Sequence, residues 1–153
     1  MLHPGLVVAG VIVVLDQLTK WAVLSWLDRD IALTPFFNLV LVWNKGVSFG
    51  MFDSGGARAP WLLSGLALAV VIVLLVWLRR AEQPLTGVGL GLIIGGAVGN
   101  VIDRVRFGAV VDFLDAHALG WHWPAFNVAD SAICIGAVLL LVDGLLMRRY
   151  HST

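Results

Sequence analysis

Two aspartates stand at the edges of apolar segments, where a buried carboxylate is unfavourable. Asp112 ends the apolar run of residues 109–111, and Asp130 follows Asn127 at the head of another apolar stretch. A carboxylate at the centre of a membrane helix costs about 2.5–3.5 kcal/mol on insertion scales, so acids retained at such positions are candidate functional residues. Two carboxylates that approach one another can share a proton and activate water, which is the chemistry of aspartic proteases.

The residues alone leave three roles open for this pair. No basic residue lies at helical spacing from Asp112 or Asp130. The two acids could therefore form a catalytic dyad, a proton or ion relay, or structural acids whose charge is satisfied by the fold. Asp115 is a competitor for either position, and we expect it to be solvated.

The composition is that of an integral membrane protein. Of the 153 residues, 59% are hydrophobic and 13% are charged, and the mean hydropathy is +0.92. Soluble domains carry about 25% charged residues. The formal net charge is zero, so no basic field favours nucleic acid as a partner. The single cysteine, Cys134, lies in an apolar run, where the expected role is that of a small hydrophobic residue in a helix.

Four apolar stretches are long enough to cross a bilayer, whose hydrocarbon core of about 30 Å needs about 20 helical residues. The expected spans cover approximately residues 6–27, 60–78, 85–102 and 127–147. They predict a single membrane-embedded domain over residues 1–153, with the all-α fold of a four-helix bundle. No small-residue cleavage site follows the first span, so we expect it to be retained as a signal-anchor.

Basic residues predict the orientation of the spans. Arg79-Arg80 lie between the second and third spans, and Arg148-Arg149 follow the fourth. Two crossings separate the pairs, so both lie on one side, which the positive-inside rule makes cytoplasmic. Both termini would then be cytoplasmic, and Asp112 and Asp130 would lie near the outer face. Asp143 is expected to form a charge-paired helix end with the last two arginines.

The third span carries a glycine at every fourth position. These are Gly87, Gly91, Gly95 and Gly99. Positions four apart lie on one helix face, so the pattern predicts a smooth stripe against which a neighbouring backbone packs closely.

The connection after the first span contains a strand pattern. Residues 37–43 are rich in strand formers, and residues 44–46 supply turn residues before residues 47–49. We expect a hairpin or small extracytoplasmic β-sheet, a cradle lying on the membrane surface.

The connection after the third span is aromatic. Residues 113–126 carry Trp121 and Trp123, which predicts an interfacial amphipathic helix or ledge that ends at Pro124. His117 and His122 accompany no H-E-x-x-H motif or cysteine partner. We therefore expect the histidines to pack at the interface and to bind no metal.

Two polar clusters interrupt the apolar spans. Asp16 and Lys20 are four residues apart in the first span, a spacing that predicts an ion pair. Asn100, Asp103 and Arg104 lie at the outer end of the third span, where Asp103 and Arg104 are expected to pair with each other or to brace neighbouring polar groups.

Five sequence blocks, taken in order, resemble the signature of the bacterial lipoprotein signal peptidase family, also called signal peptidase II. They are residues 16–20 (DQLTK), 44–49 (NKGVSF), 96–104 (GAVGNVIDR), 110–113 (VVDF) and 126–131 (FNVADS). One such block would be weak evidence, whereas five in register, from the first span to the fourth, are specific.

The resemblance implies an intramembrane aspartic endopeptidase. Its substrate would be a diacylglyceryl-modified prolipoprotein, cut just before the lipidated cysteine. Asp112 and Asp130 would be the catalytic residues. Residues that line or support the site would be Asn44, Gly46, Asn100, Arg104, Asn127 and Ala129, and the structural polar residues would be Asp16, Lys20 and Asp103.

The resemblance also implies the surroundings of the enzyme. It would lie in the bacterial inner membrane as a multi-pass protein and would need no cofactor or metal. Its partners would be the lipidated prolipoprotein and membrane lipid, without nucleic acid, and the peptide antibiotic globomycin would occupy its substrate groove. We expect a monomer.

The alternative is a small proton-coupled transporter or channel component. In it, Asp16, Asp112 and Asp130 would form a relay. A chain of 153 residues without an internal repeat is small for a carrier unless it assembles into oligomers.

Overall fold

The computed structural model describes residues 4–46 and 58–150, which form four long helices and a four-stranded sheet. Each of these helices has the length and hydropathy of a membrane span. The helices are α1 (Pro4–Trp26), α2 (Ala59–Leu78), α3 (Pro84–Phe107) and α4 (Val128–Tyr150). The strands are β1 (Ile31–Thr34), β2 (Phe37–Asn44), β3 (Val110–Ala118) and β4 (Trp121–His122). The predicted mostly helical membrane fold with a small sheet is confirmed.

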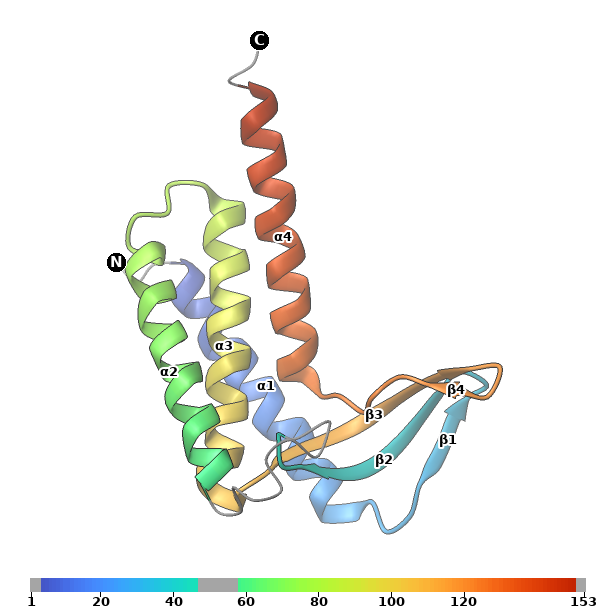
Figure 1. Cartoon of the computed structure of the whole chain (residues 1–153). Helices are drawn as coiled ribbons and strands as arrows, with labels where there is room; N and C mark the ends of the chain where they lie inside the picture. Colours follow the sequence, from blue (N-terminus) through green and yellow to red (C-terminus); the bar gives the residue numbers. More distant parts are fainter. Residues whose placement is uncertain (1–3, 47–57, 151–153) are drawn as a thin grey trace.

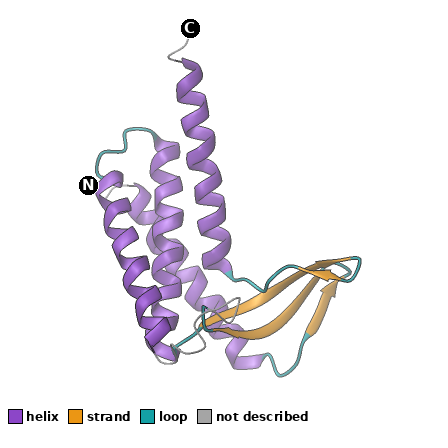
Figure 2. Ribbon diagram, in the orientation of Figure 1, coloured by secondary structure: helices purple, strands orange, loops and turns teal. Residues whose placement is uncertain are grey.

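The helices lie side by side and the sheet extends from one end of the bundle (Figures 1 and 2). The strand order is β1-β2-β3-β4, and every pairing is antiparallel. The loop with Arg79 and Arg80 and the C-terminal end of α4 lie at the opposite end of the bundle from the sheet (Figure 1). Arg79-Arg80 and Arg148-Arg149 therefore lie at the same end of the bundle, as expected for two segments that are separated by two membrane spans.

Local signals set the helix boundaries around the sheet. Pro84 occupies the first turn of α3, where its missing N–H is not needed. Gly108 ends α3 in the left-handed conformation, with φ 71°, and its N–H donates to the Arg104 carbonyl at 3.0 Å. The helix thus runs five residues past the expected end at residue 102, which keeps Asp103 and Arg104 on the helix.

The predicted glycine stripe packs against α1. A Cβ added to Gly91 would lie 2.3 Å from the carbonyl oxygen of Gly5, and one added to Gly95 would lie 2.7 Å from that of Ala9. At the end of the stripe, a Cβ on Gly99 would lie 2.6 Å from a carboxylate oxygen of Asp16. Lipid supplies no hydrophobic drive between helices, so close backbone contact of this kind is what holds them together.

A second stripe on α3, not predicted, faces α4. A Cβ on Gly96 would lie 2.4 Å from the carbonyl oxygen of Ala129, and one on Gly89 would lie 3.1 Å from that of Gly136. Thr86 also donates a hydrogen bond to Asp143 across this interface. Asp143 is therefore bonded to α3, and the side chains of its expected partners, Arg148 and Arg149, lie outside the described residues. With stripes on two faces, α3 is the central helix of the bundle.

The interfacial helix expected over residues 113–126 is wrong, because this segment continues the sheet. β3 pairs with β2 from Phe37 opposite Ala116 to Asn44 opposite Val110. Leu114 and Phe126 then exchange backbone hydrogen bonds of 2.9 and 3.0 Å. The backbone of β2 needs partners on both edges, and β1 and β3 supply them. The expected return strand at residues 47–49 lies outside the described residues.

Enlarging Gly96 should separate α3 from α4. In Gly96→Ala the new methyl group meets backbone rather than a movable side chain, so the fold should lose about 1–3 kcal/mol, as overpacked sites do. Thermal unfolding of the purified protein in detergent, followed by circular dichroism, measures the loss. Gly10→Ala is the matched control, because nothing lies within 4 Å of its added Cβ. Equal midpoints for the two variants would contradict this packing.

Candidate active site

Asp112 lies near the start of β3 and is 1% exposed. Its two carboxylate oxygens accept hydrogen bonds from the side-chain amides of Asn44, at 2.9 Å, and Asn127, at 2.7 Å. Burial raises the pKa of Asp112 to about 6, against the lowering effect of the Asn44 hydrogen bond, and the nearby charge of Asp130 raises it further. A carboxyl in this state holds its proton closer to neutral pH than an ordinary aspartate does.

A bulge in β2 brings Asn44 to the same face of the sheet as Asp112. Leu39 pairs with Leu114, but the next pair is Val42 with Asp112, so β2 has one residue more than β3 between these pairs. Since side chains alternate along a strand, Val42, Asn44 and Asp112 then point the same way. An unbroken register would place Leu41 opposite Asp112 and turn Asn44 to the other face.

Asp130 lies in the first turn of α4. Its Oδ2 accepts the backbone N–H of Asn127 at 3.2 Å, while its own N–H donates to Asn127 Oδ1 at 2.9 Å. This reciprocal pair is a capping box, with Asn127 in the cap position. The other carboxylate oxygen accepts a 2.8 Å hydrogen bond from the amide of Asn100 on α3.

Asn127 joins the two acids. It is fully buried, it caps Asp130 through its backbone and Oδ1, and its Nδ2 donates to Asp112. The same Nδ2 also lies 3.2 Å from the carbonyl oxygen of Val111 and 3.2 Å from Asn100 Oδ1. The structure therefore brings together Asp112 and Asp130, which are separated in sequence by most of the β3–β4 hairpin.

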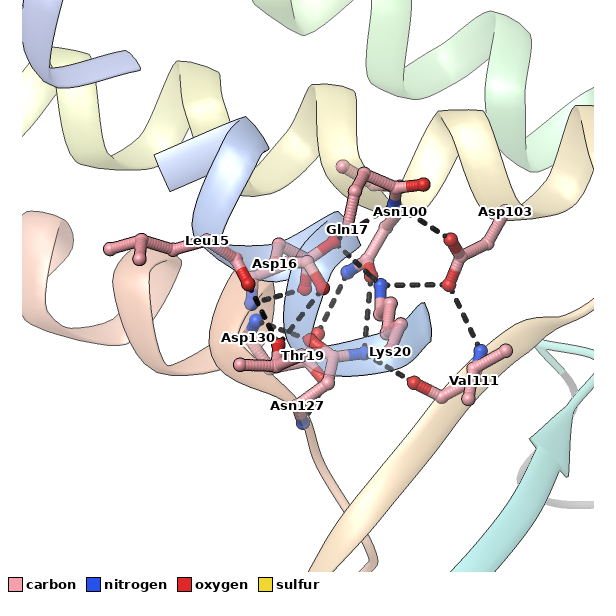
Figure 3. Close-up of polar contacts among 12 residues, drawn as sticks. Leu15, Asp16, Gln17, Thr19, Lys20, Asn100, Asp103, Val111, Asn127 and Asp130 are labelled. Atoms are coloured by element: carbon pink, nitrogen blue, oxygen red, sulfur yellow. Dashed lines mark hydrogen bonds and ion pairs between the residues drawn. The ribbon is translucent and has the colours of Figure 1, made fainter. Parts of the chain in front are cut away.

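A buried ammonium group, that of Lys20, lies among Asp16, Asn100 and Asp103 (Figure 3). Lys20 is 2% exposed, and its Nζ donates to Asp16 at 2.8 Å, to Asp103 at 2.7 Å and to the Asn100 Oδ1 at 3.2 Å. The predicted pair of Asp16 and Lys20 is confirmed. Asp103 pairs with Lys20 and not with Arg104, because neighbouring residues on a helix point in different directions.

The two carboxylates around Lys20 also hold backbone that leads to the site. Asp16 Oδ1 accepts the N–H of Ala129 at 3.0 Å, and Asp103 Oδ2 accepts the N–H of Val111 at 3.0 Å. Val111 precedes Asp112 and Ala129 precedes Asp130. Each acid is thus one residue away from a backbone group that this cluster fixes.

Gln17 also belongs to this cluster, although no pattern in the sequence predicted a separate role for it. Its Nε2 donates to Asp103 at 2.9 Å and lies within 3.3 Å of the Gly99 carbonyl, and its Oε1 accepts from Arg106 at 3.3 Å. An amide beside Asp16 in an otherwise apolar span is a signal that could have identified it, because a polar group in lipid needs partners.

Arg104 contributes positive charge without a hydrogen bond at its buried Nε. It is close enough to Asp130, Asp103 and Asp112 for its charge to interact with all three. The Arg104 side chain is partly buried, at the end of α3 that leads to β3.

Gly46 and Ala129 are the remaining predicted site residues, and both are required to be small. Gly46 has φ +82°, and a Cβ there would lie 2.2 Å from a methyl carbon of Leu63 on α2. Its N–H donates to Asn44 Oδ1 at 2.8 Å, which orients the Asn44 amide toward Asp112. Ala129 is fully buried against Gly96.

Asp115 is not solvated as expected, and it lies apart from the two acids. It is 8% exposed and accepts hydrogen bonds from Asn38, at 2.8 Å, and from the ring of His122, at 2.9 Å. Its side chain points to the other face of β3, because Asp115 is three positions after Asp112 and side chains alternate along a strand. The His117 ring stacks on that of His122, with centroids 4.9 Å apart. Within residues 4–46 and 58–150, no group of three or more His, Cys, Asp or Glu could hold a metal ion.

A family model described as signal peptidase (SPase) II matches residues 8–146. The lipoprotein signal peptidase of Burkholderia mallei (strain SAVP1) is 48% identical over 147 residues, which cover 94% of this chain and 89% of that protein. The lipoprotein signal peptidase of Janthinobacterium sp. (strain Marseille) is 51% identical over 146 residues, covering 93% and 88% of the two chains.

Two solved structures described as bacterial membrane enzymes, obtained by the in meso method, have the same fold. The one at 2.3 Å resolution aligns with a TM-score of 0.79 and 29% identity over 97% of this chain and 91% of that chain. The one at 1.9 Å resolution aligns with a TM-score of 0.81 and 27% identity over 95% and 98%. The family model and the similarity to the two lipoprotein signal peptidases show that the chain belongs to the signal peptidase II family.

Proposed function

We propose that this protein is an aspartic endopeptidase that removes the signal peptide from diacylglyceryl-modified prolipoproteins, cutting just before the lipidated cysteine. The observation that carries the proposal is the junction at Asn127, which contacts both Asp112 and Asp130. Relatives about half identical to this chain bear the name lipoprotein signal peptidase, which supports the substrate class.

Asp112 is the member of the pair that holds the proton in this proposal. Burial raises its pKa to about 6, so Asp112 keeps its proton to a higher pH than an ordinary aspartate does. Asp130 is the carboxylate, because the N-terminal end of α4 presents positive dipole to its charge and, of the two acids, it interacts more strongly with the charge of Arg104. Two acids that differ in this way can act together as acid and base.

Cleavage then needs only water and the two carboxyls. Asp130 takes a proton from water as the water oxygen bonds to the scissile carbonyl carbon, while Asp112 donates its proton to the carbonyl oxygen. The C–N bond of the tetrahedral intermediate breaks as the proton on Asp130 passes to the leaving amine and the new hydroxyl proton returns to Asp112. One water is consumed, and the pair regains its starting protonation.

The surrounding amides are oriented so that each presents its NH₂ group to a carboxylate. Lys20 and Asn127 donate to the Asn100 oxygen, which leaves the Asn100 NH₂ facing Asp130. The Gly46 N–H donates to the Asn44 side-chain oxygen, which leaves the Asn44 NH₂ facing Asp112. Fixed donors of this kind hold the reacting groups without rearrangement during the reaction.

The location follows from the topology. We propose a single membrane-embedded domain, active as a monomer in the bacterial inner membrane, with both termini in the cytoplasm and the acids near the outer face. A signal peptide would lie among the helices and present its scissile bond beside α4, where water is available. Globomycin would compete for the same place.

The relay of a transporter is not favoured by the contacts. Asp16, the third acid that a relay would need, is fully buried and bonded to Lys20 and to the Ala129 N–H. Both carboxylate oxygens of Asp16 already accept hydrogen bonds from structural groups, so this acid is poorly placed to take up and release a proton.

Replacing either acid by its amide should abolish cleavage. Asp112→Asn and Asp130→Asn remove the general acid or base, which contributes about 10²–10⁴-fold to rate. The measurement is gel-shift cleavage of a lipidated precursor by purified protein. Asp143→Asn is the matched control, because Asp143 lies on α4 far along the helix from Asp130 and bonds to Thr86. Appreciable cleavage by the double variant at positions 112 and 130 would exclude the dyad.

The pH profile should reveal the proton on Asp112. Because the folded pKa is raised to about 6, the protonated form decreases as pH rises through that value, and kcat/KM should fall on the alkaline side. Asn44→Ala removes a hydrogen bond that lowers this pKa, so the alkaline limb should move to higher pH. A limb that stays in place or moves to lower pH would contradict the assignment of Asp112 as proton donor.

The lipid on the substrate should matter more than the peptide sequence. A precursor carrying the diacylglyceryl group should be cleaved, and the same precursor with its lipobox cysteine changed to serine should not, in a side-by-side assay in detergent. Adding EDTA serves as a control and should leave the rate unchanged. Equal rates for the two precursors would show that the substrate class is wrong.

A further inference from the structure

The end of the sheet farthest from the acids is made of two hairpin turns that lie together. One joins β1 to β2, between Thr34 and Phe37, and the other joins β3 to β4, between Ala118 and Trp121. The backbone N–H of His117 donates to the Phe36 carbonyl at 2.8 Å, which ties the two turns side by side. We call these turns together the sheet tip, residues 34–37 and 118–123.

The second turn displays a leucine in a conformation that leucine rarely adopts. Leu119 and Gly120 are the central residues of a two-residue hairpin loop, with φ 51° and 80°. A turn with two positive φ values normally carries Asn-Gly or Asp-Gly, because a bulky side chain is strained there. Leu119 is nevertheless 107% exposed, so no contact within the described chain explains an apolar residue at this position.

The rest of the sheet tip is also apolar and exposed. Phe36, Trp121 and Trp123 are each at least 60% exposed, and the two tryptophan rings pack edge to face at 6.5 Å. A shallow groove of about 300 Å³ runs between these aromatic side chains, over Phe37 and His117. Large apolar patches of this kind mark a contact with a membrane or another protein.

Formal charge is absent from the sheet tip and its immediate flanks. Residues 31–37 and 116–126 contain no Asp, Glu, Lys or Arg. The nearest acid, Asp115, is covered by Asn38 and His122. Interfaces between proteins usually keep a polar, charged rim, whereas a neutral patch with tryptophans suits the lipid interface, where amphipathic rings reside.

The placement of the sheet tip agrees with a lipid contact. The sheet extends sideways from the bundle, and its β4 end turns back toward the level at which α4 begins (Figure 1). This level is where the α4 span begins, and the other three spans, α1, α2 and α3, continue past it toward the sheet-side end of the bundle (Figure 1). The sheet tip thus lies at a level that the apolar spanning helices themselves occupy.

We propose that the sheet tip is a membrane anchor, with Leu119, Trp121, Trp123 and Phe36 inserted into the lipid interface beside α4. The anchor acts on the site through β3, which runs without interruption from Ala118 to Asp112. A strand held in lipid at one end and bonded to Asp103 through the Val111 N–H at the other keeps Asp112 at a fixed depth. The anchor itself does not depend on the proposed function, but its effect on cleavage does.

Depth measurements test the anchor directly. A nitroxide is attached at Leu119→Cys in a Cys134→Ala background, and the full-length protein is reconstituted in vesicles of phosphatidylethanolamine and phosphatidylglycerol. Collisions with oxygen should exceed collisions with a water-soluble nickel chelate at position 119. At Asp30→Cys, an exposed acid in the loop before β1, the order should reverse. A label at 119 as accessible to the chelate as the one at 30 would overturn the anchor, and a partner protein would then be the better explanation.

Cleavage in two environments tests the coupling to the site. Leu119→Asp should raise KM for a lipidated precursor several-fold in the same vesicles and leave it unchanged in detergent micelles, where no planar interface exists. Leu119→Met is the matched apolar control and should behave as wild type. Equal KM values for the Asp and Met variants in vesicles would overturn the coupling. Failure of the wild-type protein to cleave any lipidated precursor would instead overturn the proposed function, while the depth result would stand.

Discussion

The arrangement of the site depends on one buried ammonium group. Lys20 is almost fully removed from solvent, and its three N–H donors are used by Asp16, Asp103 and Asn100. Removing an ion from water costs several kcal/mol, and only well-placed partners compensate for it. The position of Lys20 therefore requires three groups from α1 and α3 to converge, and the remaining bonds of these groups extend to the site.

The other hydrogen bonds of Asp16, Asp103 and Asn100 orient the groups of the site. The two carboxylates hold the backbone before each catalytic candidate, and Asn100 is turned so that its NH₂ faces Asp130. This network requires α3 to lie very close to α1 and α4. The glycines on two faces of α3 permit that approach, since a Cβ at Gly96 or Gly99 would lie 2.4 or 2.6 Å from Ala129 or Asp16. The hydrogen bonds that orient the site therefore depend on the same glycines that allow α3 to pack closely against its neighbours.

Several features could be predicted from the sequence because they depend on local physics. Apolar length identifies the four spans, the four-residue spacing identifies the pair of Asp16 and Lys20, and the glycine repeat identifies a packing face. Acids beside apolar runs mark Asp112 and Asp130 as candidates. The interfacial helix expected over residues 113–126 was wrong, because the partner strand that converts this segment to β3 and β4 comes from residues 37–44, far away in the sequence.

Sequence by itself therefore determined the class of protein, its spans and the residue types that could do chemistry, since each follows from composition or from spacing along one element. Tertiary structure alone decided which of those residues meet. The bulge between Leu39 and Val42 turns Asn44 to the face of Asp112, and the cap of α4 lets Asn127 contact both acids. Register and helix contact depend on pairings between distant segments, and no local pattern in the chain specifies a one-residue shift that changes the face of every following side chain.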